Sequence, residues 1–107
     1  TTPSSTLCNY DDNIGATTVV GSYPSGNSNL GLRDIAGNVS EFVWDWYATY
    51  PSSTQTDPIG PTTAQSLRVA RGSCWVGESL SIRCAARSAN GPYYGDYFNG
   101  FRLARTK

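Results

Sequence analysis

Two short segments of this 107-residue chain concentrate oxygen-bearing side chains in turn-forming sequence. One is CNYDDNIG at residues 8–15, and the other is DIAGNVSE at residues 34–41, in which Asp34 and Glu41 bracket a turn. Calcium binds about six to eight carboxylate, amide and carbonyl oxygens in flexible geometry, so either segment could hold a calcium ion. Neither segment matches an EF-hand, and Asx turns or a helix cap use the same residue types. Both interpretations, a metal site and a simple turn, therefore remain open.

Histidine and cysteine chemistry is limited in this chain. There is no histidine, which excludes a Ser-His-Asp or Cys-His mechanism within the chain and removes the commonest transition-metal ligand. The three cysteines, Cys8, Cys74 and Cys84, form no CxxC motif. Because their number is odd, at least one is free or pairs outside the chain.

The charge and composition of the chain limit the classes of partner that it can have. The net charge is zero, so nothing favours nucleic acid or an acidic membrane surface as a partner. Six of the eight acidic residues precede residue 60, where Arg33 is the one basic residue. This asymmetry suits a bound cation or attraction between the two halves. A composition rich in Ser, Thr, Gly, Asn and Tyr favours an extracellular or periplasmic protein, and no apolar run approaches the ~18 residues of a membrane span.

Alternation of side chains predicts the secondary structure. In GNVSEFVWDWY at residues 37–47, Phe42, Trp44 and Trp46 occupy every second position, which predicts a strand whose aromatic face lies in the core. Other strands are expected at residues 17–23, 66–72, 80–87 and 100–105. Long loops are expected at residues 48–65 and 88–100, and residues 1–7 are expected to be a flexible lead-in. No segment has the periodicity of an amphipathic helix.

Five motifs in order resemble the formylglycine-generating-enzyme (sulfatase-modifying factor) domain family. They are GSYPSGNSNLGLRDIAGNVSEFVWDWY, DPIGP, RVARGSCW, RCAARS and GFRLAR, and the order and spacing match the family over about residues 8–105. The resemblance implies a C-type-lectin-like fold of the α+β class, with little regular structure, short antiparallel strands and long loops. Domains of this family are longer, so residues 1–107 would form a single domain that is its C-terminal half. A missing N-terminal half or another chain would then cover it.

The resemblance also assigns calcium positions to both oxygen-rich segments. The first site would use Asn9, the Tyr10 carbonyl, Asp12 and the Ile14 carbonyl. The second would use Asp34, the Gly37 and Val39 carbonyls, and Glu41. The segment GNVSEFVWDWY would then be both a metal-binding turn and a core strand. Ser40 stands where the family pattern has Trp, and Phe42 replaces a second Trp, so both positions are less bulky here.

The family's catalytic positions are not matched. Formylglycine-generating enzymes carry two copper-binding cysteines between the motifs that correspond to GSCW and RCAAR. Here that stretch is VGESLSI, residues 76–82, with Gly77 and Ser79 nearest the expected positions. No catalytic residue is therefore assigned, copper is not expected, and a Cys74–Cys84 copper pair is kept only as a minor alternative. Cys84 would be a thiol in the core of a strand, and Cys74 a small buried hydrophobe.

The loop at residues 88–99 is the candidate ligand site. Its aromatic residues, separated by Gly and Asn, have the chemistry of an antibody paratope. They are Tyr93, Tyr94, Tyr97 and Phe98. The family that the chain resembles includes a branch of variable proteins that display such loops, which implies a peptide, sugar or protein ligand. The alternative is that some of these aromatic rings pack on the sheet.

The sequence as a whole predicts a non-catalytic, calcium-stabilised binding or structural module. The alternatives are a copper-dependent oxidase that converts a sulfatase cysteine to formylglycine, and the lectin-like lobe of a larger non-haem iron enzyme.

Overall fold

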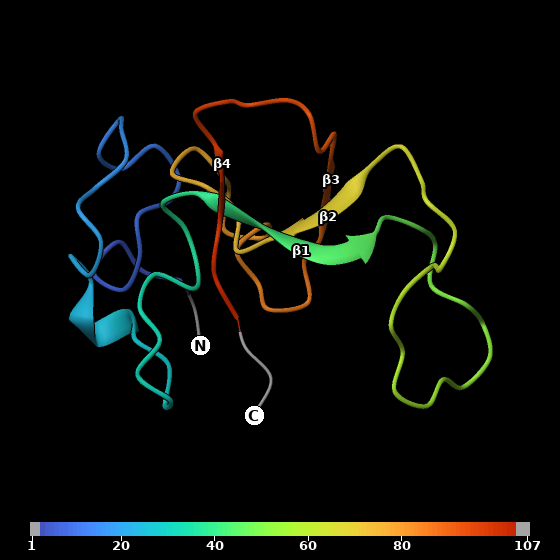
Figure 1. Cartoon of the computed structure of the whole chain (residues 1–107). Coiled ribbons are helices and arrows are strands. Elements are labelled where there is room, and N and C mark those ends of the chain that lie inside the picture. Colours follow the sequence, from blue (N-terminus) through green and yellow to red (C-terminus); the bar gives the residue numbers. More distant parts are fainter. Residues whose placement is uncertain (1–2, 105–107) are drawn as a thin grey trace.

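The computed structural model describes residues 3–104. Most of this range is irregular, and its regular part is one mixed sheet with strand order β3-β2-β1-β4 (Figure 1). The strands are β1 (Ser40–Trp46), β2 (Arg68–Arg71), β3 (Ser88–Asn90) and β4 (Asn99–Phe101), and one 3-10 turn, η1, spans Pro24–Gly26. Residues 3–104 contain no α-helix, so the α part of the α+β expectation is wrong for this range. Within the same range, no helix is long and apolar enough to cross a membrane.

The sheet is built around β1. Strand β2 pairs with it in antiparallel register, Glu41 opposite Arg71, with a bulge between Phe42 and Trp46. Strand β3 is antiparallel to β2, whereas β4 is parallel to β1, with Ser40 opposite Asn99. The expectation of antiparallel strands therefore fails at β4, because the chain returns over the sheet between residues 91 and 98 and adds β4 in the same direction as β1.

Two of the expected strands are absent. Residues 17–23 turn instead, with the Ser22 amide donating to the Val19 carbonyl and Gly21 at a positive φ of 80°. Residues 80–87 form successive turns, in which the Arg83 side chain donates to the Leu80 carbonyl. Strand β3 begins after them, inside the segment expected to be a loop. The last expected strand is shortened to β4, and its final residue, 105, lies outside the described range.

The core is small and includes two residues of β2. Its buried apolar residues are Cys8, Val69, Ala70 and Ile82. The expected aromatic core is wrong: Trp44 is 83% exposed, and Phe42 and Trp46 are only partly buried. The guanidinium of Arg68 lies over both indole rings instead, 5.2 Å from the Trp44 centroid and 3.6 Å from that of Trp46.

The two oxygen-rich segments are joined where Asn9 meets Gly37. The Asn38 amide donates to the Asn9 carbonyl at 2.8 Å, and a Cβ on Gly37 would lie 2.2 Å from that oxygen. Gly37 also has a φ of +76°, which side-chain-bearing residues rarely adopt. Glycine is thus required at position 37 both for its conformation and for the space available. The contact between Asn9 and Gly37 places residues 9–14 beside the start of β1.

Candidate functional site

The first oxygen-rich group contains a buried acceptor with no partner. Asn9 is 1% exposed, and its amide nitrogen donates to the Ala16 carbonyl at 2.8 Å. Its Oδ1 atom accepts no hydrogen bond from residues 3–104. Leaving such an oxygen unpaired costs about 1–3 kcal/mol, which a cation would offset. The residues present therefore fit an ion that prefers oxygen ligands.

The rest of this group is open to solvent. Asp12 is exposed, as is Ile14, and the Tyr10 carbonyl accepts the Asn13 amide at 3.1 Å. Asp11 and Asp12 both have positive φ, 56° and 54°, so the backbone turns sharply here. Asn9 is therefore the one buried side chain of the expected set, and the others lie at the surface around it.

The second oxygen-rich group already holds a cation from the protein. Arg102 donates from Nε to Glu41 Oε2 at 2.8 Å and from a terminal nitrogen to Oε1 at 2.5 Å. The same terminal nitrogen reaches the Asp34 carbonyl at 3.4 Å. The hydrogen bonds that Arg102 donates to the Glu41 carboxylate raise the pKa of Arg102. A calcium ion at this group would have to displace the guanidinium from Glu41.

Acidic and sulfur ligands alone would not make a metal centre in the described part of the chain. Across residues 3–104, no three His, Cys, Asp or Glu side chains are grouped to hold an ion. Asp34, for example, is not grouped with other acidic side chains, and its Oδ2 atom accepts the Gly21 amide at 2.6 Å. Any metal would need amide and backbone carbonyl oxygens as well, which are the ligands that the sequence predicts.

The candidate ligand loop presents three of its four aromatic residues to solvent. Here the tyrosine loop is residues 91–98, between β3 and β4. Tyr93, Tyr94 and Tyr97 are 95%, 78% and 85% exposed. Phe98 differs, because it is partly buried and lies against Trp75 with ring centroids 5.7 Å apart. The three tyrosines can contact a ligand, while Phe98 fixes the end of the loop.

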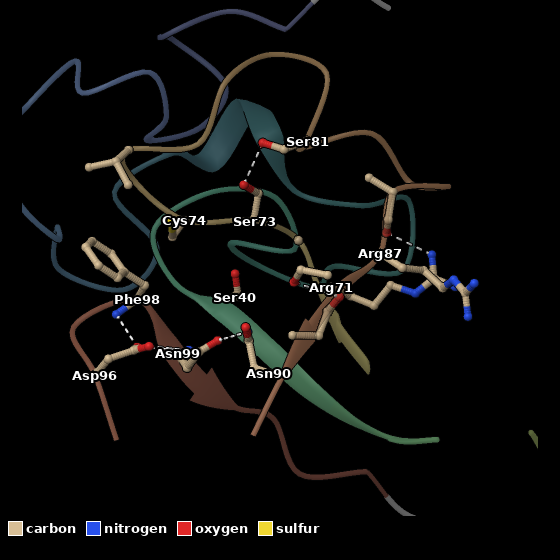
Figure 2. Close-up of a pocket in the computed structure, with 15 residues that line it drawn as sticks. Ser40, Arg71, Ser73, Cys74, Ser81, Arg87, Asn90, Asp96, Phe98 and Asn99 are labelled. Atoms are coloured by element: carbon tan, nitrogen blue, oxygen red, sulfur yellow. Dashed lines mark hydrogen bonds between the residues drawn. The ribbon is translucent and has the colours of Figure 1, made fainter. Parts of the chain in front are cut away.

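A cavity of about 320 Å³ lies beside the end of the tyrosine loop, where Asp96 and Phe98 line it (Figure 2). All four strands contribute to its lining, and Cys74 and Phe98 add side chains from the loops. The strand residues that bear polar groups on it are Ser40, Arg71, Ser88, Asn90 and Asn99. The sequence did not indicate this cavity, because the strand register that brings these residues together is not visible in it.

The cysteines are unbonded in the described structure. Burial raises the pKa of Cys8. Cys74 is partly buried, with its side chain at the cavity. Cys84 is exposed, so the expectation that it lies in the core of a strand is wrong: residues 80–87 form turns, and only Ile82 among them is buried.

A second hollow lies under the long loop at residues 48–65. Arg87 is held there by stacking, its guanidinium 3.7 Å from the Tyr50 ring centroid and 4.9 Å from that of Tyr47. It also donates to the Ala48 carbonyl at 3.1 Å. These contacts indicate a structural role for Arg87.

The fold and the motif order define the class of protein. Residues 2–107 match the sulfatase-modifying factor enzyme 1-like domain, so the chain belongs to this family, as its motifs predict. It is 46% identical over 93 residues to the serine/threonine-protein kinase Pkn1 of Chlamydia trachomatis, covering 83% of this chain and 15% of the kinase. It is 36% identical over 98 residues to the formylglycine-generating enzyme of Mus musculus, covering 88% of this chain and 26% of that enzyme.

The same class is found among solved structures. Treponema denticola variable protein 1 superposes with a TM-score of 0.76 at 33% identity, over 90% of this chain and 34% of that protein. In all three comparisons, the chain spans about a third or less of its relative's length. This partial coverage is consistent with a domain of a larger protein.

Proposed function

We propose that this chain is a non-catalytic binding module whose tyrosine loop contacts a protein or peptide partner. The observation that carries the proposal is the exposure of Tyr93, Tyr94 and Tyr97 on a loop whose base is fixed. Tyrosine offers a large contact area at a low cost in conformational entropy, and rigid presentation reduces that cost further.

The base of the tyrosine loop is fixed by side-chain hydrogen bonds. Asp96 accepts the Phe98 amide at 2.8 Å, and both of its carboxylate oxygens accept the Asn99 side chain, at 2.9 and 2.8 Å. At the other end, the Tyr94 amide donates to the Gly91 carbonyl at 3.2 Å. A Cβ on Gly91 would lie 2.5 Å from the Tyr94 ring, so this ring packs directly on the backbone.

A catalytic role has less support. The oxidase alternative needs a pair of thiols, and the sequence places Gly77 at one of the two positions. A Cβ at Gly77 would lie 2.0 Å from the Ser73 hydroxyl and 2.9 Å from that of Ser81. A cysteine at position 77 would therefore have to displace the Ser73–Ser81 hydrogen bond, whose oxygens are 2.8 Å apart. The backbone is arranged around a residue with no side chain.

Calcium is proposed as the stabilising ion, bound at the Asn9 group. The unpaired Asn9 Oδ1 supports this choice. When bound, the ion would supply positive charge to a segment that carries Asp11 and Asp12. Asn9, Asp12 and the Tyr10 and Ile14 carbonyls would hold it. The second set, Asp34, Gly37, Val39 and Glu41, remains a prediction that requires Arg102 to move.

A covering partner is supported by apolar exposure. A shallow hollow of about 720 Å³ is lined by the apolar residues Phe42, Val43, Trp44, Pro92 and Ala104, together with Glu41, Arg68, Arg71 and Arg102. Phe101 and Leu103, on the returning chain, are 77% and 88% exposed. The proposal is that the N-terminal half of a C-type-lectin-like domain, or another chain, covers this surface in an extracellular or periplasmic setting.

The proposal is tested by peptide selection against the 107-residue chain. Peptides selected from a random display library should lose at least about tenfold in affinity when Tyr93 and Tyr97 are changed to Ala, since each ring is expected to supply a kcal/mol or more. Leu30→Ala is the control, because Leu30 is a large exposed side chain on another loop. Selected peptides that bind the double variant as well as the unchanged chain would refute the proposal.

A further inference from the structure

The shallow hollow of about 720 Å³ along β1 carries more positive than negative charge. Its lining contains three arginines and one acidic residue, so the local excess is two positive charges. These residues are Arg68, Arg71, Arg102 and Glu41. We propose that the hollow binds an acidic protein segment from outside this chain, with a carboxylate that pairs with Arg68. The inference rests on the covering partner proposed above and names its chemistry.

One of the three positive charges is neutralised within the chain. Arg102 and Glu41 form an ion pair, which is the only salt bridge among residues 3–104. Arg71 donates to two backbone carbonyls, which are uncharged acceptors and leave its charge in place. Arg68 and Arg71 therefore account for the excess positive charge of the hollow.

The charge of Arg68 is held in a fixed position. Its guanidinium lies over the indole rings of Trp44 and Trp46, and one terminal nitrogen donates to the Trp44 carbonyl. Aromatic rings and a carbonyl attract the guanidinium but do not neutralise it. Within residues 3–104, its other N–H groups donate to no acceptor, and no carboxylate oxygen lies within 4 Å of it. A carboxylate from a partner can accept two of these N–H groups at once.

Apolar side chains line the hollow beside this charge. Phe42 and Trp44 come from β1 and Pro92 comes from the tyrosine loop, and Trp44 is 83% exposed. Covering exposed apolar surface is favourable by about 25 cal/mol per Å², so a free anion or water would leave most of the available binding free energy unused. The occupant that fits both properties of the hollow has apolar side chains next to its carboxylate.

The size of the charge excess favours an acidic protein segment over nucleic acid. Nucleic acid carries about one negative charge per nucleotide and is bound by extended basic surfaces. The hollow has an excess of only two positive charges, and the chain as a whole has no net charge. One or two carboxylates match this excess. The occupant is therefore a segment in which Asp or Glu stands beside apolar residues.

Position 44 allows the sign of the charge to be tested at an exposed site. Trp44→Glu and Trp44→Lys both remove the ring and differ in the charge that they add to the hollow. An added carboxylate would compete for Arg68 and repel an acidic segment, whereas an added ammonium group would attract it. Trp44→Glu should therefore bind acidic peptides at least about tenfold more weakly than Trp44→Lys.

The experiment uses the 107-residue chain with Tyr93→Ala and Tyr97→Ala as its background, so that the tyrosine loop does not select the peptides. Peptides are selected from a random display library on this background, and their affinities are measured by fluorescence anisotropy at low and high salt. We expect them to contain Asp or Glu beside apolar residues and to bind more weakly as salt rises. Arg68→Gln should weaken binding at least about tenfold. Arg83→Gln is the control, because the Arg83 side chain contacts the local Leu80 carbonyl.

The two variants of Trp44 decide the proposal even if Arg68→Gln does not fold. Equal binding by Trp44→Glu and Trp44→Lys would overturn it, as would selected peptides without acidic residues or a selection that yields no peptide. A labelled oligothymidylate that binds more tightly than the peptides and depends on Arg68 would also overturn it, in favour of nucleic acid. None of these results affects the test of the tyrosine loop, which uses the chain with both tyrosines in place.

Discussion

Glu41 and Arg102, 61 positions apart in the chain, form a bidentate ion pair at the start of β1. The same guanidinium donates to the Arg33 carbonyl at 2.9 Å. One side chain from the end of the described range thus joins the turn before β1 to the strand itself.

Replacing Arg102 by Lys should lower the free energy of unfolding by about 1 kcal/mol. Lysine keeps the charge but cannot reach Glu41 and the carbonyls together, and both partners are partly exposed, which limits the loss. Chemical denaturation measures the effect. Arg83→Lys is the control, because the Arg83 side chain makes a local contact with the Leu80 carbonyl. An equal effect of the two changes would contradict the special role of Arg102.

Removing calcium should lower the melting temperature, and Asn9→Ala should remove most of this dependence. An ion present at about 100 times its dissociation constant stabilises the folded state by about 2.7 kcal/mol. Elemental analysis and thermal melts with and without a chelator measure the two effects. Asp11→Asn is the matched control, since Asp11 lies in the same segment but outside the predicted ligand set. A melting temperature that is the same with and without the chelator would contradict the metal assignment.

Gly37→Ala should destabilise the protein more than Gly31→Ala. Both glycines have nearly the same positive φ, 76° and 77°, so both changes carry the backbone penalty of about 1–2 kcal/mol. Only at Gly37 would the new Cβ also collide with the Asn9 carbonyl, whereas nothing lies within 4 Å at Gly31. Urea unfolding of the two variants isolates the cost of the collision. Equal losses would mean that the two oxygen-rich segments are not tightly joined.

Cys8 should make stability fall at alkaline pH. Burial raises the pKa of its thiol above the usual 9.0, so the folded state holds the proton more tightly than the unfolded state. Its contribution is complete below pH 9.0 and is lost as the pH rises from there through the folded-state pKa. Urea unfolding between about pH 8 and 10 measures the slope, and Cys8→Ala should reduce it. A slope unchanged in Cys8→Ala would assign the effect to other groups.

The sequence predicted the parts of the fold that depend on local pattern. Alternation located β1 and β2, and the ordered motifs identified the family. Alternation failed at residues 80–87, because an alternating pattern forms a strand only if a neighbour is available to pair with it. It also misplaced Trp44, since periodicity shows which side chains share a face but not whether anything covers that face.

The candidate site was only partly predictable for the same reason. Exposure of the tyrosines follows from their Gly- and Asn-rich surroundings, which sequence shows. The cavity requires Ser40, Asn90 and Cys74 to meet across three segments of the chain. That meeting depends on strand order and curvature, which no local pattern encodes.

The parallel pairing of β1 and β4 has a consequence for how the chain reaches its native state. Ser40 and Asn99 are neighbours across the ladder but far apart in sequence. A large loop must therefore close before this pair gains any hydrogen bond, and such closure delays folding. The β1–β2 pair closes a shorter loop, so β4 should be the last strand to dock and the first to detach. Until β4 docks, the edge of β1 is unpaired, and a protease or a chaperone would act on the chain there before folding is complete.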